Sequence, residues 1–143
     1  MGWLATPKRI LEPSRSRIVF LLIGLAAFAA TEFGRFVCRP HVRSHGINDF
    51  GITDSIGNLG GIVVMIFLGC AAMNPTKPQS FRLATFYSLG FVLYEFLQPI
   101  LPKGVFDWKD VYGTAVGFLV AIVILGGVWR VMKGEDHEER TSK

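Results

Sequence analysis

Two acidic motifs of the same pattern precede apolar stretches of the chain, and their carboxylates are well suited to binding or acid–base chemistry. Residues 54–61 read DSIGNLGG and residues 110–117 read DVYGTAVG. A carboxylate in the first turn of a helix can accept hydrogen bonds from free N–H groups, and it faces the positive end of the helix dipole. We therefore expect Asp54 and Asp110 to cap the starts of two helices.

Two further carboxylates lie inside apolar stretches. Glu95 has Gln98 one turn later, and Glu32 takes the matching place earlier in the chain, with Arg35 as an i,i+3 partner. An ionisable group within a bilayer is costly and by default indicates a functional site. Together with nearby polar residues, these side chains form the candidate ligand-binding set: Glu32, Asp49, Asp54, Asn58, Glu95, Gln98, Asp107 and Asp110.

The elements that must position these side chains are four apolar blocks. Half of the 143 residues are apolar, and a helix needs about 20 apolar residues to cross the hydrocarbon core of a membrane. No stretch shows the strict alternation of a membrane β-strand. We therefore predict an all-α membrane protein with four transmembrane helices, in residues 17–36, 56–73, 81–101 and 111–132.

The four predicted helices form two similar halves. In each half a Glu-Phe pair, a loop with Gly and Asp, and the Asp-Gly motif follow in the same order. This order predicts a parallel repeat of two helical hairpins, residues 17–73 and 81–132, related by an axis along the membrane normal. The carboxylates should converge, so we expect Glu95 and Asp110 each to receive a hydrogen bond from a backbone N–H, Arg35, Lys103 or the opposite hairpin.

The glycines of the two motifs are spaced as GxxxG pairs. Glycine at this spacing lets the backbones of neighbouring helices approach closely. The pairs are Gly57 with Gly61 and Gly113 with Gly117. We expect all four glycines to lie at contacts between helices.

Basic residues are concentrated on one side of the predicted bundle. An excess of Lys and Arg marks the N-terminal segment 1–16, the connection between the second and third helices, and the end of the fourth helix. Both termini, including the charged tail 133–143, are therefore expected in the cytoplasm. The formal net charge of +4 is explained by basic residues that meet anionic lipid, so we expect no nucleic-acid partner.

One predicted loop, residues 37–55, contains side chains that can ligate a metal. Zinc accepts Cys, His and carboxylate ligands, but the spacing here matches no standard zinc finger, and interleaved arginines would repel a cation. We therefore expect a flexible basic loop that touches lipid head groups, with no metal and no cofactor. The alternative metal ligands are Cys38, His41 and His45, with Asp49 beyond them and Arg39 and Arg43 between them.

The segment YEFLQPILPKGVFDWKDVYGTAVG, residues 94–117, resembles the VanZ-like family of small prokaryotic membrane proteins. The family pattern falls here on Glu95, Gln98, Pro102, Lys103, Asp107, Asp110 and Gly117, with Thr114 in place of the usual Asn and Asn58 in place of a frequent His. The resemblance implies a multi-pass protein of the prokaryotic inner membrane. The family is named after a member linked to resistance to the glycopeptide teicoplanin.

Three functions are open for such a chain. The first is a non-enzymatic membrane protein whose outward-facing polar pocket binds a lipid or a cell-envelope precursor. The second is a small accessory subunit of a larger membrane complex, or a homo-oligomer, with the GxxxG faces as docking surfaces. The third is an intramembrane enzyme that uses the carboxylates on a lipid-linked substrate, although no nucleophile with its base is evident. We expect the first, with membrane lipids as partners.

Overall fold

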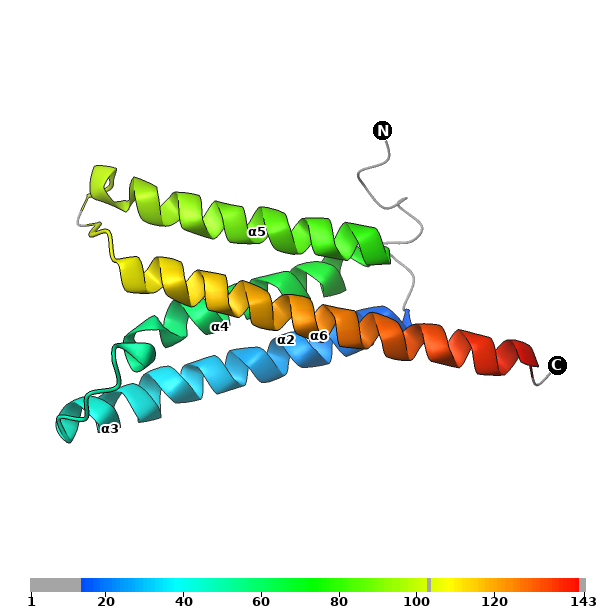
Figure 1. The fold of residues 1–143 in the computed structure, drawn as a ribbon, viewed down its shortest axis with the longest axis horizontal. Helices are drawn as coiled ribbons and strands as arrows, with labels where there is room; N and C mark the ends of the chain where they lie inside the picture. Colours follow the sequence, from blue (N-terminus) through cyan, green and yellow to red (C-terminus); the bar gives the residue numbers. More distant parts are fainter. Residues whose placement is uncertain (1–13, 103, 142–143) are drawn as a thin grey trace.

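The computed structural model describes residues 14–102 and 104–141, with residues 133–141 described as backbone. Every regular element in these residues is helical and none is a strand, which confirms the predicted all-α class. The axes of the long helices are roughly aligned and successive helices run in opposite directions, so that the α3–α4 and α5–α6 connections lie at the end opposite the C-terminus (Figure 1). The elements are α2 (Arg15–Phe33), the π-helix η1 (Gly34–Cys38), α3 (Arg39–Ser44), α4 (Ile52–Met73), α5 (Lys77–Leu97), the 3-10 helix η2 (Gln98–Ile100) and α6 (Trp108–Thr141).

Helix α4 forms the centre of the bundle. It packs against α2 and against α6, while α5 lies against α6 and more lightly against α4. The α4 side chains Ile62, Ile66 and Phe67 are fully buried, and Phe20 of α2 and Leu125 of α6 complete the core around them. Because its neighbours enclose α4 in this way, they also position the polar side chains near its N-terminal end.

Several glycines allow close approaches to α4, and the GxxxG pairs predict only part of them, Gly117 among these but not Gly60. A Cβ on Gly117 of α6 would overlap the carbonyl oxygen of Leu59, and a Cβ on Gly60 of α4 would overlap the side chain of Thr31. At Gly57, by contrast, a Cβ would meet nothing within 4 Å. Gly57 therefore makes no close helix contact, which corrects the expectation from its spacing.

The remaining two glycines of the pairs also differ from each other. A Cβ on Gly113 would lie 3.0 Å from the carbonyl oxygen of Ser55, which is a tight approach of α6 to α4. A Cβ on Gly61 would make only an ordinary contact, at 3.8 Å from the ring of Phe91. The GxxxG pair of α6 therefore lies where α6 contacts α4. On α4, the close approach is at Gly60, which does not belong to the GxxxG pair of that helix.

The first long helix extends further than the sequence predicts. Residues Arg15–Ser44 form one helical stretch, where we expect a helix ending at residue 36 and a flexible loop after it. The π-helical turn Gly34–Cys38 comes directly before Pro40, whose ring lacks the N–H that a regular helical hydrogen bond needs. The wider turn continues the helix up to the proline. As a result, the arginines of this region are held on a helix instead of a loop.

The helix starts are capped by different aspartates from those predicted. Asp49 accepts hydrogen bonds from backbone N–H groups at the start of α4, and Asp107 accepts one at the start of α6. Asp54 and Asp110 each lie one turn further, in the first turn of the helix. Asp54 is hydrogen-bonded to arginine side chains instead of to the backbone. The carboxylates of the repeated motif are thereby left for interactions across the bundle.

The end of the bundle near the start of α2 is held together by hydrogen bonds between helices. The Asn74 side chain, at the end of α4, accepts from the hydroxyls of Ser14 and Ser16 at the start of α2. The indole N–H of Trp129 on α6 donates to the hydroxyl of Ser80 on α5, at 2.9 Å. Towards the opposite end α5 and the α2–α3 stretch lie further apart (Figure 1).

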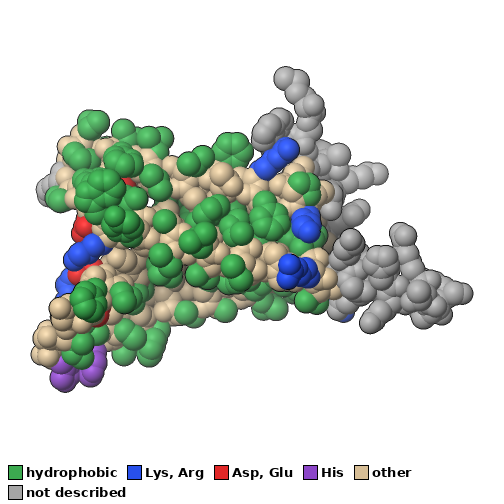
Figure 2. Space-filling model, viewed as in Figure 1, with side chains coloured by type: hydrophobic (Ala, Val, Ile, Leu, Met, Phe, Trp, Pro, Cys, Tyr) green, Lys and Arg blue, Asp and Glu red, His purple; other side chains and the backbone are tan. Residues whose placement is uncertain are grey.

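Three segments are long and apolar enough to cross a membrane: Arg15–Ser44, Ile52–Met73 and Trp108–Met132. Helix α5 does not reach this standard, since polar and charged side chains such as Arg82 and Glu95 interrupt it. Figure 2 shows hydrophobic side chains over the middle of the visible face and charged side chains towards the two ends. An apolar outer surface of this extent is typical of a surface that is covered in the working protein. The structure therefore indicates a membrane protein with three candidate spans.

Candidate functional site

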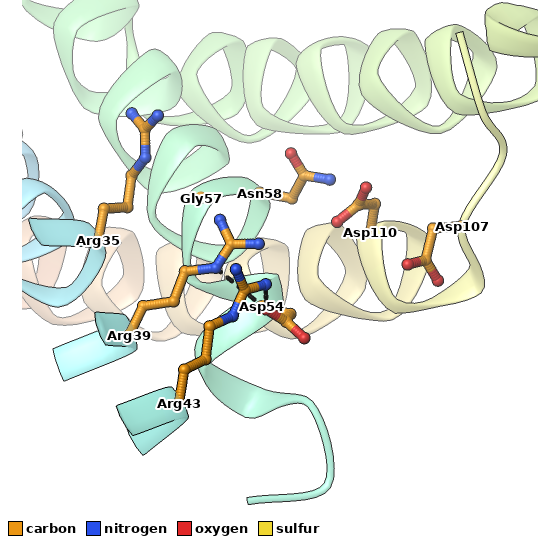
Figure 3. Close-up of a pocket in the computed structure, with 8 residues that line it drawn as sticks. All are labelled: Arg35, Arg39, Arg43, Asp54, Gly57, Asn58, Asp107 and Asp110. Atoms are coloured by element: carbon orange, nitrogen blue, oxygen red, sulfur yellow. Dashed lines mark hydrogen bonds and ion pairs between the residues drawn. The ribbon is translucent and has the colours of Figure 1, made fainter. Parts of the chain in front are cut away.

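A polar cavity of about 520 Å³ opens at the end of the bundle where the helices lie further apart. The η1–α3 stretch forms one wall, the start of α6 forms the opposite wall, and α4 lies between them (Figure 3). Cavities of roughly 300–1,000 Å³ are the usual size of small-molecule binding sites. The lining residues are Arg35, Arg39, Arg43, Asp54, Gly57, Asn58, Asp107 and Asp110.

The first wall of the cavity is a stripe of arginines. Arg35, Arg39 and Arg43 recur every four residues of one helical stretch, so their side chains lie on the same side of it (Figure 3). Arg39 Nε donates to Oδ1 of Asp54 at 3.0 Å, and Arg43 Nη2 donates to the same oxygen at 2.6 Å. Lys109 Nζ of α6 lies 3.6 Å from the other oxygen, Oδ2. Three cations therefore share the carboxylate of Asp54, which ties the start of α4 to both neighbours.

The opposite wall is acidic. Asp107 and Asp110 come from the start of α6 and face the arginine wall across the cavity (Figure 3). Oδ1 of Asp107 accepts a hydrogen bond from the backbone N–H of Lys109. No donor among residues 14–102 and 104–141 bonds the carboxylate of Asp110, and Lys103, one of the donors expected for it, lies outside the described residues. This half-buried carboxylate is therefore available to a ligand.

Glu95 supports the cavity from behind. The residue is only 2 % exposed. It accepts a hydrogen bond from Nδ2 of Asn58 on α4 at 3.3 Å and a short one from Nε2 of Gln98. Asn58 lies in the other half of the chain, so Glu95 has a donor of one of the kinds expected for it. Glu95 does not line the cavity itself, so its part is to orient the Asn58 amide, which does.

The structure brings together half of the predicted ligand-binding residues and places the other half elsewhere. Glu95 and Gln98 lie behind the cavity wall. Glu32 pairs instead with Arg35, at 3.0 Å, and Asp49 caps α4, where hydrogen bonds from the hydroxyl and N–H of Thr53 lower the pKa of its carboxyl to about 2. The predicted residues that line the cavity are Asp54, Asn58, Asp107 and Asp110.

Sequence reasoning missed the arginine wall and the part played by Gly57. The signal for the arginines was their spacing of four residues, which places side chains on one face of a helix. This spacing does not enter the prediction, because the sequence analysis ends the first helix at residue 36 and assigns residues 37–55 to a loop. Gly57 lines the cavity, and its missing side chain leaves the cavity open.

The alternative metal ligands do not form a metal site with other residues. No group of three or more His, Cys, Asp or Glu side chains in the described part of the chain is placed to hold a metal ion. The rings of His41 and His45 pack on each other, with centroids 4.2 Å apart, on the exposed surface of α3. Cys38 and Cys70 are both free thiols.

The cavity offers guanidinium groups, carboxylates and an amide, and none of its lining residues is Ser, Thr, Cys or His. Such groups suit the non-covalent binding of a charged molecule. No family model, curated protein or solved structure matches the chain. The fold and the cavity together define a helical membrane protein with a polar cavity at one end of its bundle.

Proposed function

We propose that this chain is a four-span membrane protein whose cavity binds the polar head of an amphipathic ligand, a lipid or a cell-envelope precursor, without acting on it chemically. In this proposal α5 is the fourth span, both termini are cytoplasmic and the cavity faces outward. The resemblance to VanZ-like proteins is part of the same proposal, and it rests on residues 94–117.

The open space at Gly57 is the observation that carries the proposal. Glycine inside a helix costs about 1 kcal/mol relative to alanine, so a glycine there needs a reason. Close packing is not the reason, because a Cβ at this position would meet nothing within 4 Å. Gly57 instead lines the cavity, where any larger side chain would occupy the volume available to a ligand.

The distribution of basic residues supports the proposed orientation of the chain in the membrane. One end of the bundle holds the start of α2, the start of α5 and the last described side chains of α6. The described charged side chains there are all basic: Arg15, Arg17, Lys77, Arg82 and Arg130. An excess of Lys and Arg favours the cytoplasmic side. Helix α5, with 21 residues, is long enough to span a membrane, and its polar side chains Ser80, Ser88 and Glu95 are buried.

The binding proposal is tested with Gly57→Leu, matched by Gly126→Leu. Both glycines lie within helices, and a Cβ at either position meets nothing within 4 Å, but only Gly57 lines the cavity. We expect the protein purified in mild detergent to carry a stoichiometric lipid that Gly57→Leu removes and Gly126→Leu retains, measured by mass spectrometry. Equal lipid content in all three proteins would contradict the proposal.

The topology is tested by labelling single cysteines in intact cells, with Cys38 and Cys70 replaced by serine. Gly46→Cys and Val105→Cys lie in the connections next to the cavity. If α5 spans the membrane, both are labelled from outside. If α5 does not span, residue 105 lies on the same side as the α4–α5 connection, and only one of the two cysteines is labelled.

A further inference from the structure

The two walls of the cavity carry opposite charges, and this arrangement indicates which head group fits between them. The arginines of η1 and α3 face the aspartates at the start of α6 (Figure 3). Asp54, on α4, lies between the walls and pairs with the arginine side. A ligand between the walls would therefore meet cations at one end and carboxylates at the other.

The arginine wall has more donors than Asp54 uses. A guanidinium group has five N–H donors, and Arg39 and Arg43 direct one each to a single oxygen of Asp54. With Lys109 close to the second oxygen, the cations exceed the carboxylates at this wall. Guanidinium groups bind phosphate with paired hydrogen bonds and particular strength. The wall thus suits a phosphate group.

The acidic wall of the cavity suits a positively charged group of the ligand. No hydrogen bond or ion pair from the described residues reaches the carboxylate of Asp110, and Asp107 precedes it directly before the start of α6. Asp110 is partly buried and Asp107 is exposed, and two neighbouring carboxylates repel each other unless a cation or donors satisfy them. An ammonium group that offers N–H donors would do so.

We propose that the ligand is a zwitterionic head group in which a phosphate and a primary ammonium are joined by a short linker, as in phosphoethanolamine. The phosphate lies on the arginine wall, and the ammonium lies on Asp107 and Asp110. This inference rests on the proposed function, since it names the head group for the same cavity. The cavity volume of about 520 Å³ lies within the usual range of small-molecule sites.

Two related head groups fit the cavity less well. A quaternary ammonium is typically recognised by aromatic rings, and none of the lining residues is aromatic. A glycerol head group would satisfy the arginines but bring no charge to Asp107 and Asp110. The chemistry therefore favours phosphatidylethanolamine over phosphatidylcholine and phosphatidylglycerol.

The test uses the full chain, delipidated in detergent and titrated with these three phospholipids carrying identical acyl chains, with native mass spectrometry as the readout. We expect phosphatidylethanolamine to bind about tenfold more tightly than the other two, the size of effect that one charge-assisted contact supplies. Soluble phosphoethanolamine is tested as a competitor. If it displaces the lipid, the head group alone suffices. If it does not while the lipid preference holds, the ligand is the membrane lipid itself.

Four variants test which wall binds which part of the head group. Asp110→Asn should abolish the preference for phosphatidylethanolamine over phosphatidylglycerol, while Asp110→Glu retains it. Arg43→Gln should weaken both lipids alike. Arg130→Gln, an exposed arginine at the other end of α6, should change neither. Thermal unfolding of each variant checks that it is folded.

The outcomes separate the two proposals. Equal binding of all three lipids that Gly57→Leu removes would overturn the head-group inference and leave the proposed function standing. A lipid preference that Asp110→Asn does not change would likewise overturn the assignment of the ammonium to this wall. Binding that does not respond to Gly57→Leu at all would overturn the proposed function itself.

Discussion

The amide of Asn58 on α4 donates a hydrogen bond to the buried carboxyl of Glu95 on α5, across 3.3 Å. These residues come from the two different halves of the chain, and they meet where α4 lies at the back of the cavity. Asn58 lines the cavity, whereas Glu95 does not. Glu95 is therefore a positioning residue, because it reaches a ligand only through the orientation it gives to Asn58.

Replacement of Glu95 by alanine is expected to destabilise the protein more than replacement by glutamine. Glu95→Ala leaves the amides of Asn58 and Gln98 without their acceptor and opens a void, at a cost of about 1–3 kcal/mol. Glu95→Gln keeps the size and one carbonyl acceptor. Thermal unfolding in detergent measures the difference. Equal midpoints for the two variants would show that the carboxyl group does not hold these amides.

A second pair of substitutions tests the packing of α6 on α4. Gly117→Ala adds a methyl group where a Cβ would overlap the carbonyl oxygen of Leu59 and the side chain of Ile62. Overpacking of this kind costs about 1–3 kcal/mol. Gly126→Ala, which meets nothing within 4 Å, should be neutral or slightly stabilising, because alanine favours helix. The unfolding midpoint of the first variant should fall. A fall of the same size in both would mean that the approach at Gly117 is not tight.

The helical class could be predicted from the sequence because it depends on the length of the apolar blocks alone. The structure confirms that class and finds three segments suited to spanning a membrane. The predicted end of the first helix, at residue 36, was wrong. The helix continues through a π-helical turn and past Pro40, and composition alone does not predict such a turn. Helix ends depend on local hydrogen bonds that several sequences can satisfy in different ways.

The candidate site was predicted in part. Asp54, Asn58 and Asp110 were expected at one end of the bundle, and they line the same cavity. The choice of capping residue did not follow, since an Asp one turn earlier competes for the same N–H groups, and Asp49 and Asp107 take that place. Which carboxylate binds the N–H groups at a helix start depends on such local competition. The structure was therefore needed to identify the carboxylate of the acidic wall that has no partner.

The carboxyl of Asp49 is expected to titrate unusually low. Hydrogen bonds from the hydroxyl and then the N–H of Thr53 stabilise its charged form and lower its pKa from 3.8 to about 2. A lowered pKa in the folded protein means that the cap contributes its full stability above pH 3.8 and loses it as the pH falls through about 2. An NMR titration of the Asp49 side chain measures this midpoint.

Thr53→Val removes the hydroxyl donor to Asp49 and should move the midpoint back towards 3.8. Thr53→Ser keeps the hydroxyl and serves as the matched control, so its midpoint should stay near that of the unchanged protein. An unchanged midpoint in Thr53→Val would show that the hydroxyl is not the cause of the low value.

Thr114 presents a buried hydroxyl whose removal should stabilise the protein. Its side chain is fully buried on α6, one turn after Asp110, and its Oγ1 has no hydrogen-bond partner among the described residues. An unpaired buried hydroxyl costs roughly 1–3 kcal/mol. Thr114→Val keeps the shape and replaces the hydroxyl by a methyl group, so we expect a higher unfolding midpoint. Thr114→Ser keeps the hydroxyl and loses the methyl group, so we expect a lower one. If Thr114→Val instead lowers the midpoint as much as Thr114→Ser does, the hydroxyl is bonded in the folded protein, and α6 has a polar contact at this depth that stabilises it.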